Sequence, residues 1–366
     1  MSGAWVLQVA APLRLTFWVL AVAGAWVVFM MALVVARHVE WARAARHRAR
    51  VQAELGPVFA RFLESDDHAR LAEELRPAFL RMNAAERPVA AVLVTELMGD
   101  VSPWQKEQLR STFEQSGIVE LGERGTRRRS PWRRALACEM LGKIGTSRSV
   151  PVLLARLDDR RPEVRMSAVR ALGDIRSPDA VPALSAAFLE GRTAPTNVVG
   201  DAMRRISGEA VGPTFERGVA LPDPIIRIAA CFGLGATAGT HGAAVHRLAE
   251  VLASDSDPRV RSAAASALGL AGGGDAPAAL IAATADSDDR VRRSAVKALG
   301  RFDDPTSTDA LDERTEDEDR EVAIRSAEAL HALAKRPRAG EAARARLESS
   351  SAWAVDYART IAEVSA

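Results

Sequence analysis

The residues in this sequence with the greatest capacity for covalent or metal chemistry are its two cysteines. Two thiols bind a soft metal or act as nucleophiles only when the fold brings them together or lowers the pKa of one of them. Cys138 and Cys231 lie 93 residues apart, at the same position of a repeated window in which other copies carry Val169 and Val296. We therefore interpret both as small buried core residues and not as a reactive or metal-binding pair.

The other residue types that catalyse or ligate do not form a motif. The six histidines include no His-Glu-x-x-His sequence, and the five-residue spacing of His241 and His246 places them off a shared helical face. The run 272–274 is Gly-Gly-Gly, lies between apolar repeat segments and is not followed by Gly-Lys-Ser/Thr, which indicates an inter-helix turn. We predict no catalytic residue, metal site, cofactor or small-molecule substrate, and we expect a protein that is not an enzyme.

Clusters of arginine are candidate binding residues. Residues 124–134 contain six arginines and no acid, whereas residues 301–321 contain ten acids and three arginines. Anionic lipid headgroups attract such basic clusters at about 1 kcal/mol per well-placed side chain. A nucleic acid and a merely solvated surface are the alternative interpretations. The residues proposed to contact lipid or a partner are Arg43, Arg46, Arg48, Arg50, Arg127, Arg128, Arg129 and Arg133.

An uncharged segment near the N-terminus has the length of a membrane span. Residues 15–36 contain 22 residues without a charge, which extend about 33 Å as a helix and exceed the roughly 30 Å of a hydrocarbon core. A cleaved signal peptide is the alternative, but its apolar stretch would be shorter and would follow its basic residues. The residues at which another membrane helix would approach closely are Ala21, Gly24 and Ala25.

The arginines around this segment predict its orientation. Five follow it in residues 37–50, and one precedes it in residues 1–14. Because basic flanks stay in the cytoplasm, we expect a single-pass protein of the cell (inner) membrane with residues 1–14 outside and the C-terminal part inside.

The remaining chain repeats a twelve-residue window. Copies begin at Pro131, Pro162, Pro224, Pro258 and Asp289, with a looser one at Arg320. Their starts lie 31 residues apart, once 34, and 62 across an eroded copy near Thr193. Proline suits the first helical position, and apolar residues at window positions 3, 7, 8 and 11 form one stripe. We therefore predict about seven units of two stacked helices over residues 130–335.

These windows resemble HEAT repeats, in particular the short bacterial variety also found in phycobilisome-lyase-type proteins. The resemblance rests on apolar–arginine pairs and Ala-Leu-Gly ends, at 164–165, 226–227, 260–261 and 291–292, and at 171–173, 267–269 and 298–300. It implies an all-α fold, a right-handed α-solenoid that follows the transmembrane helix. It also implies a structural role for the repeat arginines, which are Arg134, Arg165, Arg227, Arg261 and Arg292.

Two further features of the windows lead to local predictions. The glycine at the end of the window is expected to end each helix in the left-handed conformation, at Gly173, Gly235, Gly269 and Gly300. Asp223, Asp257 and Asp288 lie four residues before a repeat arginine, a spacing that suits ion pairs or helix caps.

The segments around the regular units are less periodic. Residues 37–129 predict an irregular helical region with breaks near 56–57 and 99–103, and residues 336–366 predict closing helices. Trp353 and Tyr357 are expected to cover the last apolar face. The eroded unit at 191–219 lacks the repeat arginine, so we expect a kink or a partner contact there, with neutral drift as the alternative.

Together these features predict a membrane-anchored scaffold or adaptor. We expect its solenoid to bind a protein, most simply another membrane protein, as an accessory subunit of an enzyme such as a membrane glycosyltransferase or another envelope-assembly system. One alternative is a lyase-like enzyme that acts on a cofactor-bearing partner. Another is membrane-tethered binding of nucleic acid, which the arginines and the single tryptophan of the basic cluster at 124–134 permit.

Overall fold

The computed structural model describes residues 86–100, 102–191, 193–206, 208–239, 243–273, 275–350 and 353–364, with single positions and short stretches between 26 and 83. Most of the predicted membrane segment, including Ala21, Gly24 and Ala25, lies outside the described residues. Among the helices that are described, none combines the length and the apolar composition needed for a membrane crossing. The chain divides into two compact units, Met1–Ile118 and Val119–Ala366.

The first unit is helical in its described part. It contains α3 (Arg87–Asp100) and α4 (Pro103–Ser116), and the break predicted at 99–103 is confirmed. Ser102 and Gln105 form a capping box at the start of α4, which satisfies two backbone amides that a helix start leaves free. The break predicted at 56–57 is wrong, because residues 45–58 are continuously helical. Val51 and Leu55 are buried on this helix, so tertiary packing outweighs the poor helix propensity of glycine and proline.

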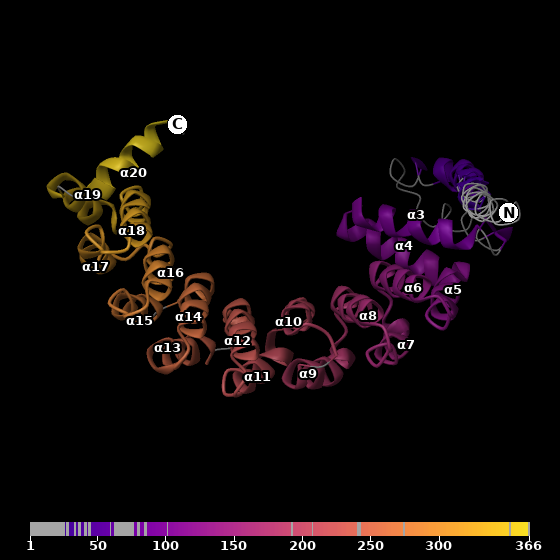
Figure 1. Ribbon diagram of the computed structural model, residues 1–366, viewed down its shortest axis with the longest axis horizontal. Helices are drawn as coiled ribbons and strands as arrows, with labels where there is room; N and C mark the ends of the chain where they lie inside the picture. Colours follow the sequence, from indigo (N-terminus) through magenta and orange to yellow (C-terminus); the bar gives the residue numbers. More distant parts are fainter. Residues whose placement is uncertain are drawn as a thin grey trace, which may run out of the picture. The chain divides into compact units, whose positions relative to one another are not determined.

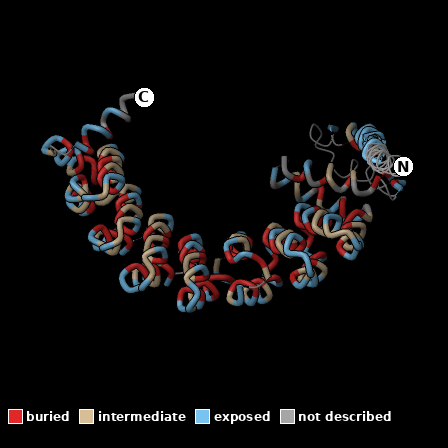
Figure 2. The backbone as a smooth tube through the Cα atoms, viewed as in Figure 1, coloured by how far each residue is buried: buried red, intermediate tan, exposed pale blue. Residues whose placement is uncertain are grey.

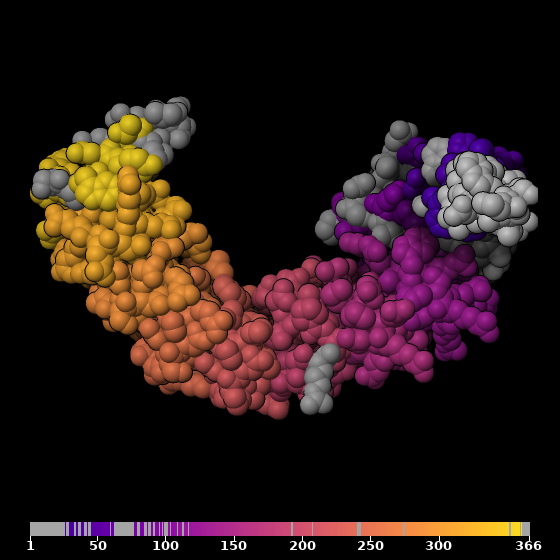
Figure 3. Space-filling view, in the orientation of Figure 1, coloured from indigo at the N-terminus to yellow at the C-terminus, as the bar shows by residue number. Residues whose placement is uncertain are grey.

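The second unit is a solenoid built from two rows of helices (Figure 1), whose side chains form a continuous curved band in the space-filling view (Figure 3). One row lies on the inner side of the curve of the solenoid, and we call it the inner row. Its helices are α6 (Pro131–Ile144), α8 (Pro162–Ile175), α10 (Thr196–Arg204), α12 (Pro224–Thr237), α14 (Pro258–Ala271), α16 (Asp289–Leu299), α18 (Arg320–Leu333) and α20 (Trp353–Val364). The outer row consists of α5 (Ile118–Gly125), α7 (Val150–Leu154), α9 (Val181–Glu190), α11 (Gly208–Gly218), α13 (Ala244–Ser254), α15 (Ala276–Ala283), α17 (Ser307–Arg314) and α19 (Gly340–Ser349). The predicted all-α solenoid is therefore confirmed.

The core of the solenoid lies between the two rows, as the buried positions in Figure 2 show. In α8 the predicted stripe of Val164, Ala168, Val169 and Leu172 is fully buried. Each inner-row helix packs on the next one, and the outer-row helices from α7 to α19 each pack on an inner-row neighbour. The apolar stripe of each window is thus buried by the neighbouring units, as the repeat pattern requires.

The glycine that closes each window does not end its helix in a left-handed conformation, so this prediction is wrong. Gly173 lies inside α8, whose left-handed cap is Arg176, and Gly300 follows α16 with a φ of −61°. The physical reason is close packing. A Cβ added to Gly173 would lie 2.6 Å from the Cα of Ala202, and one added to Gly142 would lie 2.5 Å from the Cα of Ala171. The same approach recurs in later units, where Gly235 faces Ala267, Gly269 faces Ala298 and Gly300 faces Ala329.

The closing helices α19 and α20 are present, but the residues expected to cover the last apolar face do not do so. Trp353 and Tyr357 are 45% and 42% exposed, while Ala354, Val355 and Ala358 in the same part of α20 are buried. The guanidinium of Arg320 lies 5.1 Å from the centre of the Trp353 ring, a cation–π contact at the surface. Small side chains thus pack α20 against α18, and the aromatic ones remain accessible.

Candidate interaction surface

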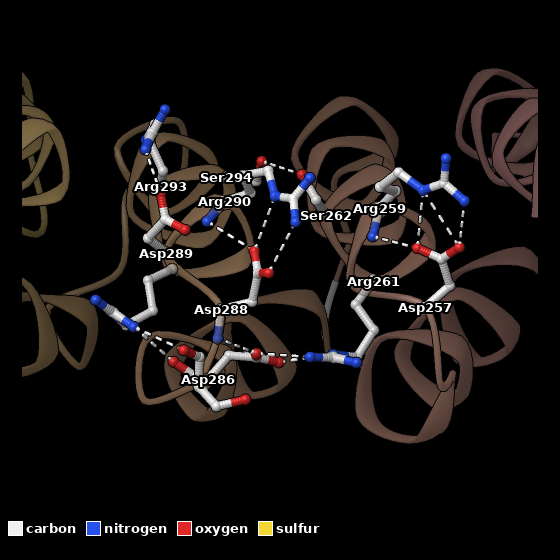
Figure 4. Close-up of polar contacts among 12 residues, drawn as sticks. Asp257, Arg259, Arg261, Ser262, Asp286, Asp288, Asp289, Arg290, Arg293 and Ser294 are labelled. Atoms are coloured by element: carbon white, nitrogen blue, oxygen red, sulfur yellow. Dashed lines mark hydrogen bonds and ion pairs between the residues drawn. The ribbon is translucent and has the colours of Figure 1, made fainter. Parts of the chain in front are cut away.

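Each repeat arginine links its own unit to the following one. Arg261 donates from Nε and Nη2 to both carboxylate oxygens of Asp286, each at 2.8 Å (Figure 4). Its Nη1 also donates to the backbone carbonyl of Asp255 at 2.9 Å. The planar guanidinium suits such bidentate binding of a carboxylate. One side chain thus joins the loop before its helix to the turn that starts the next inner-row helix.

The same arrangement recurs along the solenoid, and we call it the arginine–aspartate ladder. Its bidentate pairs are Arg134–Asp159, Arg227–Asp255, Arg261–Asp286 and Arg292–Asp317. Each of these aspartates also accepts a hydrogen bond from the backbone amide two residues later. The carboxylate therefore shapes the turn into the next helix while it binds the preceding arginine.

The ladder pairs are shielded from water, and the hydrogen bonds from the arginines keep the aspartates ionised. In the pair Arg292–Asp317 the side chains are 6% and 2% exposed. Hydrogen bonds from Arg261 hold the pKa of Asp286 below its usual value, and those from Arg134 do the same for the pKa of Asp159. Both carboxylates are thus charged at neutral pH, and their arginines do not offer a free guanidinium to a ligand.

The partners of the repeat arginines differ from those that the sequence spacing indicated. Asp223, Asp257 and Asp288 are helix caps, whose side chains accept from the amides of Ile225, Arg259 and Arg290. The cap alternative is therefore confirmed. The ion pairs with Arg227, Arg261 and Arg292 are instead formed by aspartates from the next unit, 25 or 28 residues later.

The eroded unit interrupts the ladder. Thr196 occupies the position of its arginine, and Leu221 occupies the position of the aspartate that would pair with it. The preceding arginine, Arg165, donates to the backbone carbonyls of Thr193 and Asp159. The helices α10 and α11 nevertheless form, with Phe188 and Phe215 in an edge-to-face contact at 5.3 Å between ring centres.

Both cysteines lie in the core. Cys138 and Cys231 are fully buried, and burial raises the pKa of each thiol to about 12. A thiol with such a pKa is protonated at neutral pH and is a poor nucleophile or metal ligand. In the described part of the chain, no group of histidine, cysteine and acidic residues has a metal-binding arrangement.

The predicted basic residues lie in both units. One helix of the first unit carries Arg46, Arg48 and Arg50, and on it Arg50 pairs with Glu86 at 3.1 Å. Arg43 lies outside the described residues. Four exposed arginines surround the start of α6 in the second unit, namely Arg127, Arg128, Arg129 and Arg133. Trp132, in the same stretch, is 65% exposed.

A second set of surface residues was not found by sequence analysis. Among the side chains that the structure describes between residues 119 and 360, the large apolar ones that are exposed all lie on inner-row helices, and they are Trp132, Ile225, Phe232, Leu270, Trp353 and Tyr357. The available signal was an apolar residue at a window position where other copies are polar. Ile225, for example, aligns with Arg259 and Arg290.

The chain was compared with known families and structures. The family described as HEAT repeats matches residues 120–196, 218–294 and 277–362. A search of curated proteins gives no significant match. Among solved structures, Kap121p is 14% identical with a TM-score of 0.52, over 88% of this chain and 37% of its own. This similarity supports the α-solenoid fold and nothing further.

The matches with two other solved structures cover nearly all of the length of those proteins. Human deoxyhypusine hydroxylase in complex with glycerol is 21% identical with a TM-score of 0.32, over 67% of this chain and 94% of its own. The complex of CpcE and CpcF of phycocyanin lyase from Nostoc sp. PCC7120 is 21% identical with a TM-score of 0.34, over 71% and 94%.

Proposed function

Because this chain belongs to the HEAT-repeat family, whose solenoids generally bind proteins, we propose that it is a membrane-anchored scaffold that holds a protein partner on its inner row of helices. The observation that carries the proposal is the one-sided distribution of exposed apolar side chains in the second unit. Ile225 and Leu270 are 60% and 59% exposed on neighbouring inner-row helices. Exposed apolar groups that gather on one face are typical of interaction surfaces.

The arrangement favours binding over catalysis. Four of the five repeat arginines are engaged in the ladder, Arg165 donates to backbone carbonyls, and both thiols are buried. A scaffold needs only a shaped, partly apolar surface, which the inner row supplies.

The anchor is the second part of the proposal. Residues 15–36 are long and apolar enough to span a bilayer, and a tether of this kind raises the effective concentration of the solenoid near other membrane proteins. We therefore place the solenoid in the cytoplasm beside a membrane enzyme, for example a glycosyltransferase or another envelope-assembly enzyme, as an accessory subunit.

Site-specific photo-cross-linking in the source cell tests the scaffold. A photo-reactive amino acid at Ile225 should give an adduct with one protein, identified by mass spectrometry. The same amino acid at Glu209, an exposed residue of the outer-row helix α11, is the matched control and should not give that adduct. No protein adduct at Ile225, or equal adducts at both positions, would contradict the proposal.

Two measurements test the anchor separately. The full chain should remain with the membrane fraction after a high-salt wash, because apolar insertion does not depend on ionic strength. A C-terminal alkaline phosphatase fusion should be inactive if the solenoid is cytoplasmic. High phosphatase activity, or a protein that salt releases from the membrane, would refute this part.

A further inference from the structure

Three neighbouring inner-row helices carry an apolar area next to a basic one. On α12 the exposed residues are Ile225 and Phe232, and on α14 Leu270 is exposed near the helix end. On α16 the corresponding residues are basic, namely Arg290 and Lys297, and Arg301 follows in the turn after this helix; all three are exposed. We call Ile225, Phe232, Leu270, Arg259, Arg290, Lys297 and Arg301 the α12–α16 surface.

These residues are in register across the three helices because they occupy equivalent window positions. Ile225, Arg259 and Arg290 follow the helix starts. Phe232 and Lys297 both occupy window position 9, and Leu270 and Arg301 both directly follow the twelve-residue window. A hydrogen bond of 2.8 Å between the hydroxyls of Ser262 and Ser294 joins α14 to α16 on the same side (Figure 4). The surface is thus continuous across the helices.

The arginines at the helix starts are held in place and keep donors available. Arg259 binds Asp257 through Nε and Nη2, and Arg290 binds Asp288 in the same way, while side-chain exposures of 56% and 54% leave the outer edge of each guanidinium in solvent. The two aspartates are also engaged by backbone amides at the helix starts, which compensates part of their charge. A guanidinium fixed in this way loses little entropy when it binds a carboxylate.

The basic area includes Lys297 and Arg301 and ends at α18. Lys297 is exposed, and Arg301 donates from Nη1 to the carbonyl of Gly269 at 3.3 Å, across to α14. Arg293 does not belong to the surface, because it is engaged by Asp289, Asp319 and Glu321. Beyond α16 the acidic Glu321 of α18 ends the basic area.

We propose that the α12–α16 surface binds a linear segment of the protein partner that combines apolar side chains with carboxylates. This inference rests on the proposed scaffold function and specifies the chemistry of its partner. Adjacent helices pack about 9 Å apart, so α12 and α16 are separated by roughly 18 Å, which an extended chain covers in about five or six residues. We therefore expect the apolar side chains of the segment to lie about five or six residues from its carboxylates.

A peptide fits this surface better than a nucleic acid. Phosphate backbones require an extended positive track, and single-stranded bases stack on aromatic rings. Here the surface contains a single aromatic ring, Phe232, beside the aliphatic Ile225 and Leu270, and Glu321 adds negative charge at the border. A segment that is both apolar and acidic satisfies both areas, and its carboxylates match the side chains of Lys297 and Arg301.

The experiment uses the purified full chain and a phage-displayed library of random 16-residue peptides. Enriched peptides are synthesised with a fluorophore, and their affinity is measured by fluorescence anisotropy. We expect the enriched sequences to share an apolar residue and at least two acids about six residues away. Enrichment of basic or purely apolar peptides, or no enrichment, would overturn the proposal.

Variants of exposed residues locate the binding. We expect Lys297→Glu to weaken binding about fivefold and Leu270→Ser to weaken it about tenfold. Arg217→Glu, which reverses an exposed charge on the outer-row helix α11, should bind as the unchanged protein does, and circular dichroism checks that all three variants fold. Equal affinities of all variants would refute the location.

Other occupants and the failure of the scaffold itself give different results. If a 20-nucleotide DNA or RNA displaces the peptides and loses affinity in Lys297→Glu, the surface binds nucleic acid and the proposal is wrong. If sedimentation shows self-association that Lys297→Glu abolishes, the occupant is a second copy, and the proposal is again wrong. A cross-linked partner at Ile225 whose capture both variants leave unchanged would sustain the scaffold and refute this site.

Discussion

Two regions of the solenoid reach the same helical stacking by different means. From α12 to α18, ladder pairs connect successive units, and their members are shielded from water. Around α10 and α11 the ladder is interrupted, because Thr196 and Leu221 replace its arginine and its aspartate. The close approach of Gly173 to Ala202 is nevertheless retained there.

This difference separates two functions of the repeat consensus. The apolar stripe and the glycine–alanine contacts are sufficient to stack α8, α10 and α12. The ladder adds a polar connection at the turns between units. In the eroded unit its arginine and its aspartate are both replaced, and Arg165 of the preceding unit donates to backbone carbonyls instead. Packing therefore forms the solenoid, whereas the ladder strengthens the junctions between particular units.

The largest effect is expected from breaking the most buried ladder pair. Asp317→Ala removes the carboxylate that Arg292 binds at 2.9 Å and leaves a buried guanidinium without its main partner, which costs about 3 kcal/mol of unfolding free energy. Chemical denaturation measures this loss, and hydrogen exchange should increase mainly in α16–α18. Glu190→Ala, at the equivalent but exposed position before the eroded unit, should change stability by less than about 0.5 kcal/mol. Equal losses in the two variants would show that the ladder does not distinguish the regions.

The next largest effect is expected from the contact that both regions share. Gly173→Ala places a methyl group 2.6 Å from the Cα of Ala202, so α8 and α10 must separate. Overpacking of this kind costs about 2 kcal/mol, measured by thermal or chemical denaturation. Gly239→Ala is the matched control, since no atom lies within 4 Å of the added carbon. A Gly173→Ala protein as stable as the control would contradict the role assigned to this glycine.

A smaller effect is expected from acidification. The pKa values of Asp159 and Asp286 are lowered in the folded protein by hydrogen bonds from Arg134 and Arg261. Such carboxylates stabilise the fold above their unfolded pKa, near about 4, and this contribution is lost as the pH falls through the folded pKa. The unfolding free energy should therefore decrease below about pH 4, and less steeply in Asp286→Asn. Parallel pH curves for the two proteins would exclude a contribution from this pair.

The smallest effect is expected from rebuilding the ladder in the eroded unit. Thr196→Arg and Leu221→Asp restore both members of the missing pair. Each change alone should destabilise the protein, because it buries a charge without a partner. In a double-mutant cycle the two should couple favourably by up to about 1 kcal/mol. A coupling of zero would indicate that α10 does not bring these positions together as the regular units do.

The helices were predictable because their signals are local. Proline or aspartate at each start and apolar residues at positions 3, 7, 8 and 11 predicted α8, α12, α14 and α16, and even the eroded window gave α10. The role of Gly173 was not predictable from a single sequence, because glycine after a leucine is typical both of a helix end and of a close helix–helix contact. Only the position of Ala202 in the next unit distinguishes the two.

The interaction surface and the ladder partners were harder to predict for a related reason. Arg261 lies four residues after Asp257, which indicates a local pair, but its partner Asp286 comes from the next unit. That neighbour depends on how the units stack and not on spacing within one helix. Ile225 and Leu270 likewise appear as ordinary apolar residues until the inner row is known to be their environment.

The ladder has a consequence for how such an array changes in length. Each regular unit supplies one arginine to the junction after it and one aspartate to the junction before it. A gene duplication or deletion of one entire 31-residue period therefore adds or removes a donor and an acceptor together, and it leaves no buried charge unmatched. An array of this design can gain or lose periods in evolution without an electrostatic penalty, whereas an insertion of half a period breaks a junction at once.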